Sequence, residues 1–176
     1  GAIPNRRTID ERPAVVEEKS RLGDWEADTI IGKNHQQAIV SLVDRKTKYC
    51  LLAKVAQKTA AVVEAAICRK LARHKAKVKT ITSDNGREFA HHEQIARHLE
   101  ADFFFAHPYH SWERGVNENT NGLVRQYFPK KMAFEQITDE QIQAVEDKLN
   151  SRPRKRLGYQ TPKELFFKEQ KIALAT

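Results

Sequence analysis

The distribution of apolar positions first predicts three strands in the opening third of the chain. Residues 25–31 form an aromatic and β-branched run that stops at a glycine, and residues 38–43 and 48–55 form two similar runs. The connection 44–47 is short enough for a hairpin between the last two runs. We therefore expect these three strands to form an antiparallel meander.

Helical and strand-like patterns then alternate. Over residues 59–74, apolar side chains recur every four residues, as in an amphipathic helix. A strand is expected at 78–83, a short helix at 92–99 and a further strand at 103–106. Two strands separated by a helix, after a meander, predict an α/β fold: a mixed five-stranded sheet, three strands antiparallel and two added in parallel, flanked by helices.

Helices are expected through the last third of the chain. One begins near Val116 and cannot pass Pro129, because proline cannot continue a helix. Capping-box patterns at Thr138 and Thr161 begin two more, the second with proline at its first helical position.

The opening residues, 1–22, are polar, charged and punctuated by prolines. We expect an extended lead-in arm there, followed by one domain over residues 23–176 that is long enough to bury a core. No apolar run approaches the roughly 20 residues that a bilayer requires, so a membrane-spanning segment is not expected. The chain opens on Gly1 rather than methionine, and we expect it to be a fragment of a longer protein.

The net charge indicates the class of partner, and the cysteine content indicates the cellular setting. The chain has 31 Lys and Arg against 23 Asp and Glu, a net charge of +8 that favours a polyanion such as nucleic acid. Cys50 and Cys68 lack the spacing of a zinc finger or a disulfide framework, so we expect a reducing, cytoplasmic setting. Four histidines have no cysteine near them and are not assigned to zinc: His91, His92, His107 and His110.

Two aspartates follow or interrupt predicted strands. Asp84 comes directly after the strand at 78–83, where ligand sites of α/β sheets gather, although Asp84, Asn85 and Gly86 also suit an ordinary turn. Asp28 lies inside an apolar strand, where a buried carboxylate is costly without a partner. It is either functional, exposed to solvent or paired with a distant Lys or Arg.

A glutamate on the helix that begins near Val116 is the third candidate. Glu118, Gly122 and Arg125 lie on one helical face, and Arg125 is suited to a phosphate. The segment is rich in Asn, Thr and Gly, which are poor helix formers, and such a local conflict hints at function. If Glu118 converges with the two aspartates, mutual repulsion requires a proton or a cation, and hard oxygen ligands favour two Mg²⁺ or Mn²⁺ ions that act on a phosphodiester.

Three motifs resemble the catalytic core of insertion-sequence-thirty-type bacterial transposases, relatives of retroviral integrases. They are Trp25-Glu-Ala-Asp-Thr29, Ser83-Asp-Asn-Gly-Arg-Glu-Phe89 and Glu113-Arg-Gly-Val-Asn-Glu-Asn-Thr-Asn-Gly122, and 33 residues (85 to 117) separate Asp84 from Glu118. The similarity extends to residues 150–155 and 161–166. It implies a ribonuclease H-like fold and an enzyme that nicks transposon ends and joins the freed 3′ hydroxyl to target DNA.

The resemblance also implies roles for the acids. Asp28 would bridge both metal ions, Asp84 would complete one site and Glu118 the other. Glu113 is a second-ranked glutamate, and Asn85 would orient a ligand or shape the corner. The weaker rivals are Asp24, Glu26 and Asp44.

DNA contacts are expected around this site. Tyr109 and Trp112 would either stack on an unpaired base or pack against the sheet. Basic side chains would bind phosphates or form an ordinary solvated face: Arg125, Lys130, Lys131, Arg152, Arg154, Lys155 and Arg156. By resemblance, the partners are transposon-end and target DNA, the active form is a homodimer, and sequence-specific end binding belongs to an N-terminal helix-turn-helix region that is absent from this sequence.

Two alternatives stay open. A ribonuclease H-type or structure-selective nuclease would use the same ions without joining strands. An inactive DNA-binding module would retain only the basic surface, although a dead site has no physical reason to keep repelling carboxylates together.

Overall fold

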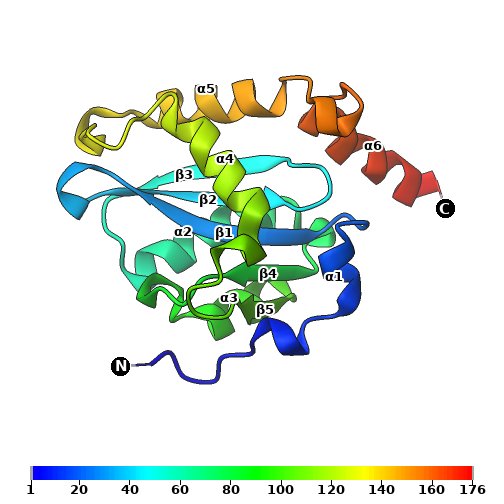
Figure 1. Cartoon of the computed structure of the whole chain (residues 1–176), viewed down its shortest axis with the longest axis horizontal. Coiled ribbons are helices and arrows are strands. Elements are labelled where there is room, and N and C mark those ends of the chain that lie inside the picture. The colour runs from blue at the N-terminus through cyan, green and yellow to red at the C-terminus, as the bar shows by residue number, and fades with distance from the viewer. Residues whose placement is uncertain (1, 176) are drawn as a thin grey trace.

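A mixed sheet of five strands organises the molecule, in the order β3-β2-β1-β4-β5 (Figure 1). The computed structural model describes the backbone of residues 2–175 and the side chains of residues 2–168. The strands β1 and β2 are antiparallel, as are β2 and β3, whereas β4 and β5 are each parallel to their neighbour. Their bounds are Asp24–Ile31, Ala38–Asp44, Cys50–Val55, Thr80–Ser83 and Asp102–Phe105. The predicted mixed sheet is confirmed.

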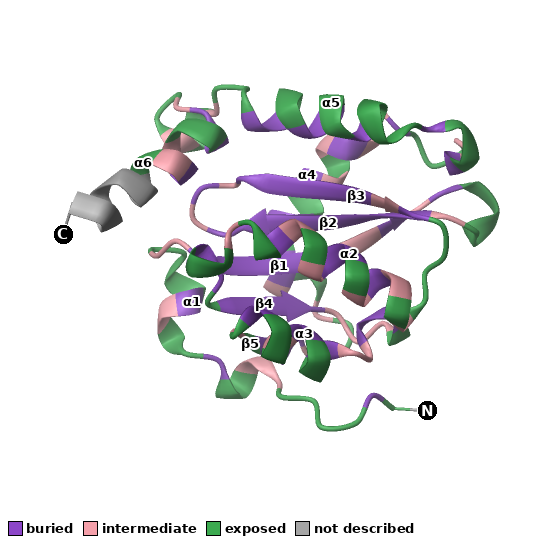
Figure 2. Ribbon diagram, turned by 180° about the vertical axis from the view of Figure 1, so that it is seen from behind, coloured by how far each residue is buried: buried purple, intermediate pink, exposed green. Residues whose placement is uncertain are grey.

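Helices cover both faces of this sheet. On one face lie α2 (Ala60–Ala72) and α3 (His92–Leu99), and on the other α4 (Gly115–Arg125) and α5 (Asp139–Asn150). The short helix α1 is Ala14–Glu18, and α6 is Pro162–Ala175. Figure 2 shows the strands buried between these layers.

The alternation along β1 divides its side chains between two cores. Trp25 and Ala27 belong to the core under α2 and α3, whereas Ile30 belongs to the core under α4 and α5. The Trp25 indole is fully buried, packs edge-on against Phe166 of α6 and donates from Nε1 to the Lys77 carbonyl at 2.9 Å. The predicted alternation therefore holds, and it sends every second residue of β1 towards α4.

Side chains that cap the helices explain where the later ones begin. The Thr138 hydroxyl accepts from the Gln141 amide at 3.1 Å and the Gln141 side chain accepts from the Thr138 amide at 2.8 Å, a complete capping box. The Thr161 hydroxyl accepts from the Glu164 amide at 3.0 Å. Both predicted starts are confirmed.

The lead-in arm differs from its prediction. Residues 1–22 are not extended throughout, because a 3₁₀ turn at Ile9–Glu11 and helix α1 interrupt them. The arm also pairs with the sheet: the Phe105 amide donates to the Arg7 carbonyl at 2.8 Å, and Thr8 forms a parallel bridge with Phe105. The segment around Thr8 and the turn at Ile9–Glu11 thus lie at the edge of β5, and Pro13 directly precedes α1.

Helix α5 supplies hydrogen bonds to the opposite edge of the sheet. The buried Asn150 side chain accepts from the Cys50 amide at 2.9 Å and donates to the Cys50 carbonyl at 2.8 Å. One turn earlier, a Glu146 carboxylate oxygen accepts from the Leu52 amide at 2.8 Å. These contacts satisfy backbone groups that an edge strand otherwise leaves unpaired.

The substitution Asn150→Ala tests this contact. We expect it to lower the free energy of unfolding by roughly 2–4 kcal/mol, because two buried backbone groups of Cys50 lose their partner. Urea denaturation of purified chain measures the loss. Ser151→Ala, at the next and exposed position, is the matched control, and equal stability of the two variants would contradict the account.

Candidate active site

Asp28 lies on the face of β1 that points to α4. Its side chain is only 16% exposed. The Thr29 amide donates to Oδ1 at 2.8 Å and the Asn121 amide group donates to Oδ2 at 2.9 Å. Burial raises the pKa of Asp28 above its ordinary value, although Arg114 opposes that rise. The carboxylate is therefore held in one orientation at an electrostatic cost.

Asp84 follows the last residue of β4. The parallel register pairs Asp24 with Thr80 and Glu26 with Thr82, so continuing it by two residues brings Asp84 level with Asp28. The Asp84 side chain is 41% exposed, and its Oδ1 accepts from the Gly86 amide at 2.9 Å. The interpretations of Asp84 as a turn residue and as a metal ligand are compatible, because the turn at residues 84–86 fixes the direction of the Asp84 carboxylate.

Arg114 lies between the two aspartates. Its Nη1 is 3.2 Å from Asp28 Oδ2, and its Nη2 is 3.8 Å from Asp84 Oδ2. The guanidinium is 9% exposed, and its Nε and Nη1 have no well-aligned acceptor within the described residues. Arg114 is thus the distant Lys or Arg that the sequence analysis named as one possible partner of Asp28. Charge attraction holds the guanidinium there more than directed hydrogen bonds do.

Glu118 occupies the first turn of α4 but does not join this pair. Its carboxylate is exposed and has no hydrogen-bond or ion-pair partner in the described part of the chain. Among the described side chains, Asp28, Asp84 and Glu118 do not form a group with ligand atoms within 4.8 Å of one another. The structure therefore brings two of the three predicted acids together, with an arginine between them.

The asparagines of α4 form a polar contact with the sheet. Asn117 is fully buried; its backbone amide donates to Glu26 Oε1 at 3.1 Å, and its Nδ2 donates to the Glu26 carbonyl at 3.2 Å. One turn on, Asn121 accepts from the Ser41 hydroxyl at 2.8 Å while it donates to Asp28. The poor helix formers in this segment are therefore the side chains that position the helix.

The three rival acids have structural roles. Glu26 is buried against Asn117, with Arg45 Nε 3.5 Å from its Oε2. Asp24 binds Arg21 with two contacts at 2.8 and 2.9 Å. Asp44 accepts from the amides of Gly23 and Thr47 at 2.8 and 2.9 Å, as its predicted place in a turn implies.

Glu113 contacts two histidines rather than the aspartates. The His107 amide donates to Glu113 Oε1 at 2.9 Å, and His107 Nδ1 lies 3.0 Å from Oε2. On the other side of the same ring, His107 Nε2 lies 3.0 Å from Asp10 Oδ2. Hydrogen bonds to Asp10 and Glu113 raise the pKa of His107.

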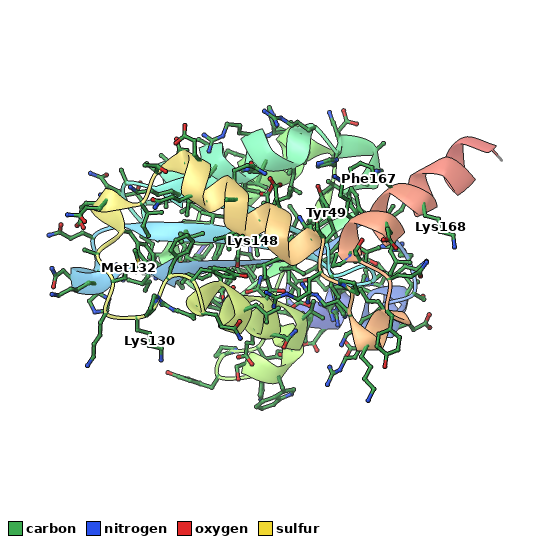
Figure 3. The ribbon with its side chains drawn as sticks, turned by 90° about the horizontal axis from the view of Figure 1, so that it is seen from above. Tyr49, Lys130, Met132, Lys148, Phe167 and Lys168 are labelled. Carbon is green, nitrogen blue, oxygen red and sulfur yellow. The ribbon has the colours of Figure 1, made fainter. Side chains whose placement is uncertain are left out.

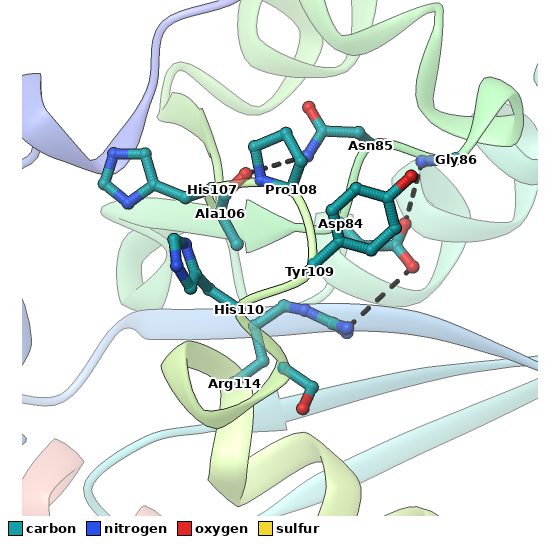
Figure 4. Close-up of a pocket in the computed structure, with 10 residues that line it drawn as sticks. Asp84, Asn85, Gly86, Ala106, His107, Pro108, Tyr109, His110 and Arg114 are labelled. Atoms are coloured by element: carbon teal, nitrogen blue, oxygen red, sulfur yellow. Dashed lines mark hydrogen bonds and ion pairs between the residues drawn. The ribbon is translucent and has the colours of Figure 1, made fainter.

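An open cleft of about 400 Å³ borders this region, and Asp84, Asn85, Arg114 and the loop 106–111 line it (Figure 4). Asn85 shapes the corner, because its Nδ2 donates to the Ala106 carbonyl at 2.8 Å and its Oδ1 accepts from Arg6. Tyr109 is 99% exposed and Trp112 69% exposed, so these two aromatic side chains do not pack against the sheet.

The predicted basic residues fall into two groups. Arg125 and Arg154 are half-buried and donate to the carbonyls of Ile31 and Leu149, each at 2.9 Å, and burial lowers the pKa of both. The others are exposed: Lys130, Lys131, Arg152, Lys155 and Arg156. Figure 3 shows Lys130 pointing away from the body of the molecule.

A second cleft, of about 410 Å³, lies beside the beginning of α4. Gly115 and Asn119 line it together with five cations: Lys19, Lys48, Arg154, Lys155 and Arg156. Sequence reasoning missed Lys19 and Lys48, because each comes from a segment distant in the chain from α4. It also missed the role of Arg114, which lies inside a quoted motif but contacts Asp28, a residue far from it in the chain. The spacing of Asn117 and Asn121, four residues apart on one helical face, was a usable local signal.

Residues 19–111 match the Integrase core domain family, which is more than half of the chain. The chain therefore belongs to the integrase core domain family. Its fold resembles the catalytic core domain of BIV integrase, with a TM-score of 0.66 at 19% identity over 88% of this chain and 99% of that one. The predicted ribonuclease H-like fold is confirmed.

Particular relatives are transposases. The chain is 55% identical over 166 residues to the transposase for insertion sequence element IS4351 of Bacteroides fragilis, covering 94% of this chain and 51% of that protein. It is 38% identical over 173 residues to transposase InsI for insertion sequence element IS30A of Escherichia coli strain K12, covering 98% and 44%. The chain spans about half the length of these curated relatives. No described helix is long and apolar enough to cross a membrane.

The buried asparagine of α4 provides a test of this site's framework. Asn117→Ala should destabilise the chain by about 1–3 kcal/mol, because the Glu26 carbonyl and the Ser41 hydroxyl lose a buried partner. Asn119→Ala, on the exposed face of the same helix, should instead be neutral or stabilising by about 0.5 kcal/mol through helix propensity. Chemical denaturation measures both, and a destabilising Asn119→Ala would contradict the assignment of faces.

Proposed function

We propose that this chain is the catalytic core of a transposase that cleaves DNA at the ends of an insertion sequence and joins the freed 3′ hydroxyl to target DNA. The observation that carries the proposal is the pair formed by Asp28 on β1 and Asp84 directly after the adjacent β4, in an integrase core domain, with the cation of Arg114 between them. Burial raises the pKa of Asp28, which makes its ionised form costly. Carboxylates perturbed in this way are typical of functional sites, and an ion pair that only stabilises the fold has no need of one.

The residues fit a divalent metal ion. The guanidinium of Arg114 stands where a cation is needed, and its poorly aligned contacts make it replaceable. Asp28 and Asp84 would hold Mg²⁺ or Mn²⁺, and Glu118, exposed and unpaired in the described part of the chain, would complete the set. When bound, a pair of such ions would lower the pKa of the attacking water or hydroxyl and stabilise the negative charge on the leaving oxygen.

Backbone amides and one side chain of this chain orient the two carboxylates. The Thr29 amide and Asn121 hold Asp28, and the Gly86 amide holds Asp84, so neither carboxylate must reorganise to bind an ion. Arg114 offsets the charge of the pair, and a bound ion would compete with it for the same carboxylate oxygens.

DNA would approach along both sides of α4. On one side lies the cleft with Asp84, beside the exposed rings of Tyr109 and Trp112, which are free to stack on an unpaired base. On the other side lies the cleft with five cations, which suits a phosphate backbone. A homodimer that pairs two transposon ends, at work on DNA in the bacterial cytoplasm, is the assembly we propose.

The first experiment replaces one aspartate. Asp84→Asn should reduce Mn²⁺-dependent cleavage of a transposon-end oligonucleotide by roughly 100-fold or more, because several kcal/mol of charge stabilisation disappear. Salt-sensitive DNA binding should remain. Asp102→Asn, an exposed acid at the opposite end of the parallel strands, is the matched control. Undiminished cleavage by Asp84→Asn would refute the assignment.

The same preparation separates the alternatives. A precut end with a free 3′ hydroxyl yields joined product from a transposase, but not from a ribonuclease H-type or structure-selective nuclease or from an inactive binding module. The assay uses the full-length protein, because the chain spans only about half the length of its relatives.

The second experiment tests the competition with Arg114. Arg114→Gln should raise the affinity for Mn²⁺ by about tenfold, or roughly 1.4 kcal/mol, because the ion no longer displaces a guanidinium. Mn²⁺ titration followed by electron paramagnetic resonance measures the affinity. Arg87→Gln removes an exposed positive charge three residues from Asp84 and controls for net charge. Equal affinities of the two variants would contradict the competition.

A further inference from the structure

A second group of metal-ligating side chains lies in the loop between β5 and α4. His107, His110 and Glu113 follow one another at intervals of three residues, and one ligand atom of each lies within 4.8 Å of the others. His107 Nδ1 is 3.0 Å from Glu113 Oε2, and His110 Nδ1 is 3.8 Å from Glu113 Oε1. Figure 4 shows the two imidazole rings near one another at the side of the cleft.

One nitrogen of this group lacks a hydrogen-bond partner among the described residues. His110 Nδ1 is buried and has no hydrogen bond within the described residues, although the ring as a whole is 43% exposed. A buried polar nitrogen without a partner is costly in a folded protein. Because this nitrogen faces a carboxylate oxygen at 3.8 Å, a cation that bonds to both would satisfy it.

Asp10 completes the arrangement from the lead-in arm. Its Oδ2 lies 3.0 Å from His107 Nε2, the ring nitrogen opposite the one that faces Glu113. A carboxylate on the far nitrogen fixes the tautomer and the orientation of a metal-binding histidine. His107 therefore has the outer partner that such ligands usually have.

We propose that His107, His110 and Glu113 bind a transition-metal ion of the Zn²⁺ class, at a site separate from the carboxylates of Asp28 and Asp84. Two imidazoles and one carboxylate form a known zinc ligand set that leaves a fourth position for water. Imidazole favours Zn²⁺ over Mg²⁺, so the two sites select different ions. The metal takes the place of the proton on His107 Nδ1, which is released to solvent.

The absence of cysteine does not argue against this site. The third ligand is a glutamate, which a search for Cys and His spacing does not detect. In the sequence, Tyr109 lies between His107 and His110, and Trp112 lies between His110 and Glu113. Glu113 directly precedes Arg114. A bound ion thus fixes the segment that presents the exposed aromatic side chains and leads into α4.

Zn²⁺ titration tests the proposal with no reference to cleavage. In the Asp84→Asn background, which weakens the other site, a competing chelator dye should report one Zn²⁺ bound per chain. Adding His110→Ala or Glu113→Gln should weaken that binding by at least about tenfold, since each removes a ligand. Adding His98→Ala, an exposed histidine of α3, should not change it. Unchanged binding in both ligand variants, or an equal loss with His98→Ala, would overturn the proposal while leaving the proposed function untouched.

Limited proteolysis gives an independent readout. Chymotrypsin cleaves after exposed aromatic residues, and Tyr109, Trp112 and Tyr159 are 99%, 69% and 70% exposed. One equivalent of Zn²⁺ should slow cleavage after Tyr109 and Trp112 by about fivefold or more relative to Tyr159, since local opening limits proteolysis. The His110→Ala variant should show no such protection. Equal rates with and without Zn²⁺ in the parent chain would count against the site.

Discussion

A carboxylate in the central strand sets the main electrostatic constraint on this molecule. Asp28 is largely buried, and the parallel register of β1 and β4 brings a second carboxylate, Asp84, level with it. Neighbouring like charges repel, and a cation between them offsets that repulsion. Arg114 supplies that charge from the turn that directly precedes α4.

The composition of α4 follows from the same constraint. A helix packed over buried acids cannot have an entirely apolar inner face, since the acids and nearby backbone groups need donors. Asn117 and Asn121 provide them, and Val116 and Val124 supply the apolar remainder. The loss in helix propensity is therefore offset by hydrogen bonds that an apolar helix does not make. This explains why a segment with weak local preference still folds as a helix.

Local sequence patterns were sufficient to predict the fold, but they did not predict which charged side chains contact each other. The capping box at Thr138 and the alternation along residues 25–31 depend on neighbours in the chain, and both were predicted from sequence. Arg114 was missed as the partner of Asp28 because 85 residues (29 to 113) separate them, and the contact forms only when the turn before α4 packs over β1. Arg125 was predicted as a phosphate ligand, yet it donates to the Ile31 carbonyl, a contact without a sequence signature.

Both edges of the sheet are occupied by other parts of the same chain. Residues 7 and 8 of the arm pair with Phe105 on β5, and Asn150 and Glu146 of α5 bind the backbone of β3. A sheet whose edges are covered resists pairing with a strand from another molecule. A surface for a partner is therefore to be sought on the helices and loops, where contacts depend on side chains rather than on backbone pairing.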